Sequence, residues 1–161
     1  MIVIAIVGVL VAIAVPGYRF ARIRGDESTA VATLDAINKA QFAFMQACGN
    51  QRYAPTLVAL GTPVPGSGSP FLSPDLAQAD PMTKSGYVFR MGATVLTEAP
   101  LTCTEAPPAS GYQVAADPLT PDVTGSRYFG TNGERVIFED LASFNGNMPE
   151  TGVPGHGREI K

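Results

Sequence analysis

The first fifteen residues of the chain, MIVIAIVGVLVAIAV, carry no charge and are apolar at every position except Gly8. A helix that is apolar on all of its faces must be surrounded by lipid or by other helices, because no side of it favours water. The remainder of the 161-residue chain has the polarity of an ordinary domain. The sequence therefore predicts an apolar segment joined to a polar body, either anchored in a membrane or buried in an assembly.

The apolar segment opens a longer helix that we expect to run from Met1 to about Cys48. Beyond Tyr18 the pattern is amphipathic, with a break at Gly25 and a C-terminus at Gly49 and Asn50. Such a helix would span about 70 Å, so its first part must project from the body. The apolar side chains that recur at three- and four-residue steps are Phe20, Ile23, Ala30, Val31, Leu34, Ile37, Phe44 and Met45.

The pattern changes to a period of two from Gly86 onward, which predicts β-strands. The alternating segments are GYVFRMGATVLTEA, GYQVAAD, SRYFGTN and ERVIFED, the last two being joined by a hairpin turn at Asn132-Gly133. Between helix and strands we expect a loop with two short helical turns, TLVALG and the Ser73-capped SPDLAQAD. The tail from Ser143 is either disordered or an extended strip on the surface.

The expected fold class is α+β, a long helix packed against a small antiparallel meander of three or four strands. The sequence divides the chain into five predicted segments: the apolar helix at 1–24, the amphipathic half of the same helix at 25–50, a connecting loop at 51–85, the sheet at 86–142 and the tail at 143–161. Cys48 and Cys103 lack any CxxC context, which disfavours zinc and redox motifs. They form either a disulfide, the natural state if the chain is exported, or two buried thiols.

The remaining composition offers little for catalysis or ligand binding. The net charge of −3 argues against a general nucleic-acid binder. His156 is the single histidine and lies in the tail, so we expect no catalytic dyad, no enzymatic activity and no cofactor. Four loop carboxylates have no calcium-loop spacing, and we interpret them as solvated groups rather than as a metal site: Asp75, Asp80, Asp117 and Asp122.

The N-terminal segment MIVIAIVGVLVAIAVPGY, which contains Gly8, Pro16 and Tyr18, resembles that of type IV pilins and of the related pseudopilins of type II secretion. GYQVAADPLTPDVTGSRYFGTNGERVIF is similar to the last strands of short type IVa pilins. The resemblance covers residues 1–140 and implies the type IV pilin fold. It implies a structural major pilin for adhesion, motility or DNA uptake. The alternatives are a pseudopilin and a membrane-anchored periplasmic binding domain.

Pilins that resemble this chain start with a few residues ending in a glutamate, after a basic leader that a prepilin peptidase removes. We therefore expect Met1 to be internal to the natural protein. About six further residues would bring the apolar run to about 21, the length that a hydrocarbon core of about 30 Å requires. The resemblance implies an N-methylated mature chain that waits in the bacterial inner membrane.

The resemblance also implies that the assembly machinery moves the chain from the membrane into an extracellular homo-oligomeric helical filament. Gly8 and Pro16 mark a segment that would lose its helical hydrogen bonds in that filament, the alternative being a continuous helix kinked at the proline. Ala5, Gly8, Ala12 and Ala14 would permit close helix contacts. The filament core would be formed by Ile2, Ile4, Ile6, Val7, Val9, Leu10, Val11, Ile13 and Val15.

Three arginines follow the apolar segment, at Arg19, Arg22 and Arg24. One interpretation is a collar that faces solvent or lipid headgroups. The other is that they pair with Asp26 or Glu27 of a neighbouring subunit, where each exposed pair would contribute little by itself.

Overall fold

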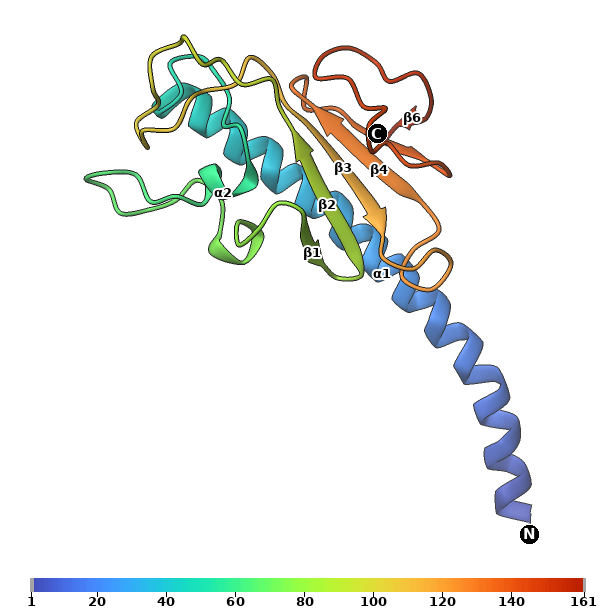
Figure 1. Ribbon diagram of the computed structural model, residues 1–161. Helices are drawn as coiled ribbons and strands as arrows, with labels where there is room; N and C mark the ends of the chain where they lie inside the picture. Colours follow the sequence, from blue (N-terminus) through green and yellow to red (C-terminus); the bar gives the residue numbers. More distant parts are fainter. Residues whose placement is uncertain (1, 161) are drawn as a thin grey trace.

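The computed structural model describes residues 2–160, and the side chains of residues 2, 4–6 and 8–16 lie outside this description. The fold is α+β, as predicted: helix α1 (Ile2–Ala47) lies across one face of an antiparallel sheet. Figure 1 shows that the N-terminal part of α1 leaves the body and projects alone. We call this part, residues 2–24, the stalk. The helix ends where Gly49 and Asn50 were expected to end it, with Asn50 at a positive φ of 50°.

The sheet is a meander of six strands in the order β1-β2-β3-β4-β5-β6, each antiparallel to its neighbours. Three or four strands were predicted, so two were missed, and both are short edge strands. Two or three residues cannot display a period-two pattern, which explains why the sequence did not reveal them. The strands are β1 (Met82–Lys84), β2 (Tyr87–Gly92), β3 (Gln113–Pro118), β4 (Tyr128–Asn132), β5 (Ile137–Asp140) and β6 (Arg158–Glu159).

The main core lies between the sheet and the second half of α1. Leu34, Ile37 and Phe44 recur at helical spacing on α1 and are fully buried. They belong to the same apolar cluster as Phe89 of β2 and Phe129 of β4. The two periodicities read from the sequence therefore meet at one interface, which fixes the body of the molecule to α1.

The tail forms a strip that covers the opposite face of the sheet. Phe144 and Met148 are buried there against Ala115 of β3 and Phe138 of β5, in a second apolar cluster. The strip then returns to the sheet edge as β6, which pairs with β5. Of the two alternatives left open for the tail, the extended strip is the one that the structure shows.

The two short helical turns lie where they were expected. Helix α2 (Leu57–Leu60) is capped by Thr56, whose hydroxyl accepts a hydrogen bond from the Ala59 N–H, and it ends at Gly61. The 3-10 turn η1 (Pro74–Leu76) follows Ser73, although the Ser73 side chain caps no backbone N–H. Both turns add buried apolar side chains to the main core, and α2 also contacts α1.

The β4–β5 hairpin uses a wider turn than a two-residue Asn-Gly turn. Asn132 closes β4, its carbonyl accepts the Arg135 N–H at 2.8 Å, and Arg135 adopts a φ of 64°. The Asn132 side chain is buried and donates to the carbonyls of Pro149 and Gly152. Asn132 therefore holds the tail as well as the turn.

Candidate assembly surface

The stalk leaves large apolar side chains in solvent. Tyr18 and Phe20 are 69% and 71% exposed, and Val3 and Val7 are exposed as well. Large apolar side chains that are exposed together on one helix indicate a contact with a partner, since their burial in an apolar environment is favourable. The stalk is therefore the strongest candidate for an intermolecular contact surface.

Several predicted filament-core positions fall outside the described side chains, although α1 is helical through all of them. These positions are Ile2, Ile4, Ile6, Val9, Leu10, Val11, Ile13 and Val15, and the predicted melting or kink positions Gly8 and Pro16 fall outside as well. Gly8 and Pro16 thus lie within one continuous helix in the single chain. Within the residues that the structure describes, no helix combines the length and the apolar character needed to cross a membrane.

A buried carboxylate, Glu27, marks the point where α1 enters the body. Its Oε1 accepts hydrogen bonds from the Ser126 N–H at 3.1 Å and the Ser126 hydroxyl at 3.0 Å. Its Oε2 accepts from Nε and Nη2 of Arg127 at 3.0 and 2.6 Å. Arg127 also pairs with Glu139, which in turn accepts a bond from Arg158. A chain of alternating charges thus joins α1 to β5 and β6.

The electrostatics of this network favour its charged form. Burial alone would raise the pKa of Glu27, but hydrogen bonds from Arg127 and Ser126 outweigh burial and lower it. The hydrogen bond that Arg127 donates to Glu27 likewise raises the pKa of Arg127, against the opposing effect of burial. Because Glu27 is only 1% exposed, it is held within its own chain. Its predicted pairing with an arginine of a neighbouring subunit stays a prediction.

The three collar arginines all point into solvent. Arg22 Nε lies 3.8 Å from Asp26 Oδ2 of the same chain, an exposed pair one helical turn apart. In the part of the chain that the structure describes, neither Arg19 nor Arg24 forms an ion pair. The collar thus keeps positive charge beside the exposed aromatic residues of the stalk.

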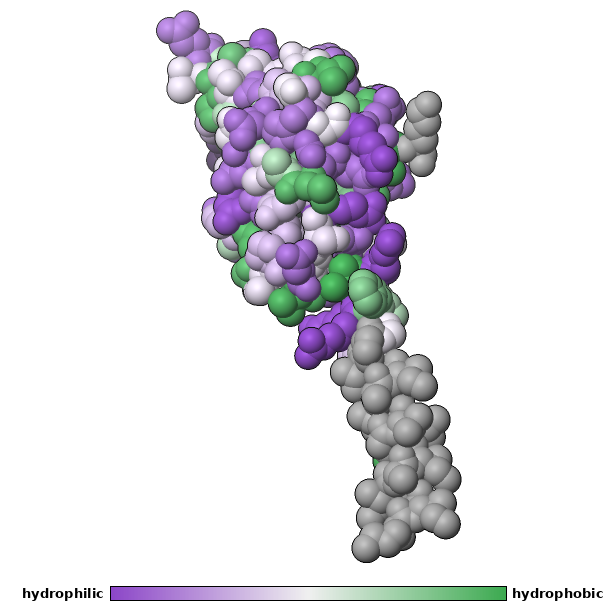
Figure 2. All heavy atoms as spheres, turned by 90° about the vertical axis from the view of Figure 1, so that its right-hand side faces the viewer, coloured by the Kyte–Doolittle hydropathy of each residue, from purple (hydrophilic) through white to green (hydrophobic). Residues whose placement is uncertain are grey.

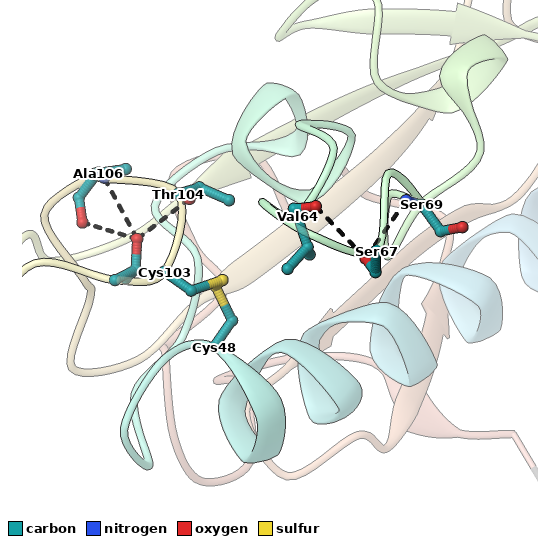
Figure 3. The surroundings of a disulfide bond; sticks show 8 residues. Cys48, Val64, Ser67, Ser69, Cys103, Thr104 and Ala106 are labelled. Carbon is teal, nitrogen blue, oxygen red and sulfur yellow. Dashed lines mark hydrogen bonds between the residues drawn. A yellow bond between two sulfur atoms is a disulfide. The ribbon is translucent and has the colours of Figure 1, made fainter.

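At the other end of α1, Cys48 and Cys103 form a disulfide with their Cα atoms 4.9 Å apart. Figure 3 shows the bond joining the last turn of α1 to the connection between β2 and β3. The Cys103 N–H also donates to the Cys48 carbonyl at 3.2 Å, and Thr102 closes the adjoining turn onto Ala106. The predicted disulfide is confirmed, and it indicates an extracytoplasmic location.

The four candidate metal-binding carboxylates lie apart. Asp75 pairs with Lys84 at 2.7 Å, and Asp117 pairs with Arg90 at 3.0 Å. Burial raises the pKa of Asp80, although the carboxylate accepts the N–H groups of Leu57 and Met91. Asp122 lies in the exposed β3–β4 loop. No group of three or more potential ligands gathers among the described residues.

Neither the tail histidine nor the groove beside α1 and β5 shows a catalytic arrangement in the described part of the chain. His156 Nδ1 lies 2.6 Å from Asp140 Oδ2, and its ring stacks on Phe144, so it helps to dock the tail. A groove of about 670 Å³ beside α1 and β5 is lined by both apolar and charged side chains. Its walls hold no histidine or cysteine that could serve as a nucleophile or base.

The charged network escaped sequence reasoning. Ser126 and Arg127 directly precede β4, which the sequence predicted. Their pairing with Glu27 depends on how that strand lies against α1, which the sequence pattern does not show.

Comparisons with protein-family models, curated proteins and solved structures found no match. The architecture itself is informative: a long N-terminal helix lies on an antiparallel meander, with a disulfide at the helix end. The fold is pilin-like.

Proposed function

We propose that this chain is a major pilin, a structural subunit that self-assembles through its stalk into an extracellular type IV pilus filament. The observation that carries the proposal is the division of α1. Its second half is buried under the sheet, whereas its first half exposes apolar and aromatic side chains. Packing stalks of many copies side by side would remove that surface from water.

Two further observations support the proposal. The disulfide is typical of a chain that works outside the cytoplasm. The body is rigidly attached to α1 through the main core and through Glu27, so movement of the stalk would carry the body with it. The chain would wait in the inner membrane with its body in the periplasm and be extracted by the assembly machinery. No catalytic activity or cofactor is required for this role.

Filament recovery tests the proposal directly. We expect mechanical shearing of intact cells to release long filaments that contain the wild-type chain. Val7→Glu should abolish them, because it places a charge among packed apolar helices. Val153→Glu is the matched control, since Val153 is 76% exposed on the tail strip, away from the stalk. Short fibres confined to the periplasm would indicate a pseudopilin, and a monomer that never sediments would contradict both assignments.

Mass spectrometry of the native protein tests the processing step independently. We expect an N-methylated mature N-terminus upstream of Met1, with a glutamate among the added residues. That result would place a prepilin peptidase among the partners of the chain. An unprocessed start at Met1 in cells that carry the protein would contradict the pilin proposal.

A further inference from the structure

The core-facing stripe of α1 does not stop where the body stops. Ile23 and Phe20 lie one and two turns before Glu27, and therefore on the same face of the helix. Glu27 is buried by the β3–β4 loop, but Phe20 is 71% exposed because nothing in the described chain covers it. The stalk thus presents an uncovered continuation of the surface that holds the body.

Positive charge and a second apolar surface frame this stripe. Arg19 and Arg24 lie on its two flanks and are exposed. The β3–β4 loop is tied to Glu27 through Ser126, at the end of this stripe, and it exposes Leu119 and Val123 together with the carboxylate of Asp122. Figure 2 shows hydrophilic and hydrophobic side chains next to one another where the helix leaves the body. We call this surface, Arg19, Phe20, Ile23, Arg24, Leu119 and Val123, the basic notch.

The opposite pole of the body has the complementary character. The connection between β2 and β3, residues 93–107, carries Glu98 and Glu105 and no lysine or arginine. Both glutamates are exposed, and Leu101 beside them is 57% exposed. The disulfide to Cys48 fixes this acidic loop to the end of α1. The acidic loop is therefore held in place at the end of the molecule opposite the stalk, where it exposes two carboxylates and an apolar side chain.

We infer that the acidic loop of one copy docks into the basic notch of a second copy, with Leu101 against Phe20 and the two glutamates against Arg19 and Arg24. This inference rests on the proposed function and names the contact that stacks the subunits. The two surfaces differ, so the contact is heterologous, and a heterologous contact that does not close extends into an open filament. From Arg22 to Cys48 the helix spans about 39 Å, which sets the approximate repeat along one such stack.

Charge reversal on each side, and then on both, tests the contact. Glu98→Arg/Glu105→Arg places like charges opposite the notch, and we expect at least about a tenfold loss of sheared filament. Arg19→Glu/Arg24→Glu should cause a similar loss, and it removes positive charge from the outer side of the membrane, which does not oppose insertion. The variant that carries all four changes should recover filaments, since opposite charges face each other again.

Glu159→Arg is the control, because it reverses an exposed charge on β6 that belongs to neither of the two surfaces, and it should leave filaments unchanged. Recovery in the fourfold variant also shows that the reversed chains fold. If the wild-type chain forms filaments and Glu98→Arg/Glu105→Arg forms as many, the docking inference is wrong and the proposed function stands. If both reversals lose filaments and the fourfold variant recovers none, the inference is also wrong. If the wild-type chain forms no filament, both fail.

Discussion

Glu27 illustrates how one carboxylate can organise the junction between stalk and body. It is buried, yet both of its carboxylate oxygens accept hydrogen bonds, one from Ser126 and the other from Arg127. Such a group stabilises the fold only while it is charged and paired, because an unpaired buried charge is strongly unfavourable. Its contribution should therefore depend on pH.

Glu27→Gln should lower the free energy of unfolding at pH 7 by about 2 kcal/mol, since it removes the charge from a bond to Arg127. The pKa of folded Glu27 lies below its ordinary value of 4.5. The stabilisation is thus fully present above pH 4.5 and is lost as the pH falls through the lower folded-state pKa. The difference between wild type and variant in urea unfolding should shrink over that acid range.

Asp35→Asn is the matched control for this measurement. Asp35 also lies on α1 and pairs with a cation, Lys39, but its side chain is 51% exposed. An exposed pair of this kind contributes about 0–1 kcal/mol, so the variant should unfold almost like the wild type at all pH values. A difference for Glu27→Gln that stays constant from pH 7 to pH 3 would contradict the role assigned to its charge.

At the scale of elements, the second half of α1 holds the body, whereas its first half would pack in the filament. In the single chain its backbone is helical through Gly8 and Pro16. A proline removes one helical hydrogen bond and glycine lowers helix stability, so this segment opens at the smallest cost. We predict that the segment between these residues becomes extended in the filament, as visualised by electron cryomicroscopy. Unbroken helical density through Val15 would contradict the prediction.

The tail strip is a second element whose role can be isolated. Phe144 is fully buried on the outer face of the sheet, against Phe138 and Met148. Phe144→Ala should cost about 3–4 kcal/mol of unfolding free energy, through lost burial and the cavity left behind. Val153→Ala, on an exposed position of the same strip, should cost almost nothing. Equal effects of the two substitutions on thermal unfolding would show that the strip is not docked in solution.

The elements with strong periodicity could be predicted from the sequence, and those held by tertiary contacts could not. Apolar residues recur at helical spacing from Ala30 to Phe44, so α1 and its buried face followed from the residues alone. The edge strands β1 and β6 are too short to carry a pattern, and β6 exists because the tail returns to β5. The pairing of Glu27 with Arg127 joins residues 100 positions apart, which no local signal could reveal.

At the scale of the whole molecule, α1 connects two poles of opposite character. The stalk and the basic notch lie at one end, and the disulfide holds the acidic loop at the other. Since both poles are fixed to one helix, their separation is set by helix length rather than by loop conformation. A rigid subunit with complementary ends is suited to build a filament of constant repeat.

The final prediction concerns the disulfide and separates stability from assembly. The bond spans 55 residues, and removing it through Cys48→Ser/Cys103→Ser should cost about 4 kcal/mol in the chain-entropy model. Phe144→Ala is the control matched for stability, since its expected cost is similar but it lies on the tail strip. Both variants should show a similar loss in urea unfolding.

Only the variant without the disulfide should yield less sheared filament per unit of folded protein, because its acidic loop is no longer fixed for docking. Filament yield is therefore divided by the amount of folded protein in the membrane fraction for each variant. If the normalised yields of the two variants fall equally, the disulfide acts through stability alone. In that case, the geometry of the acidic loop would contribute nothing to assembly, and the stacking contact would have to lie elsewhere on the body.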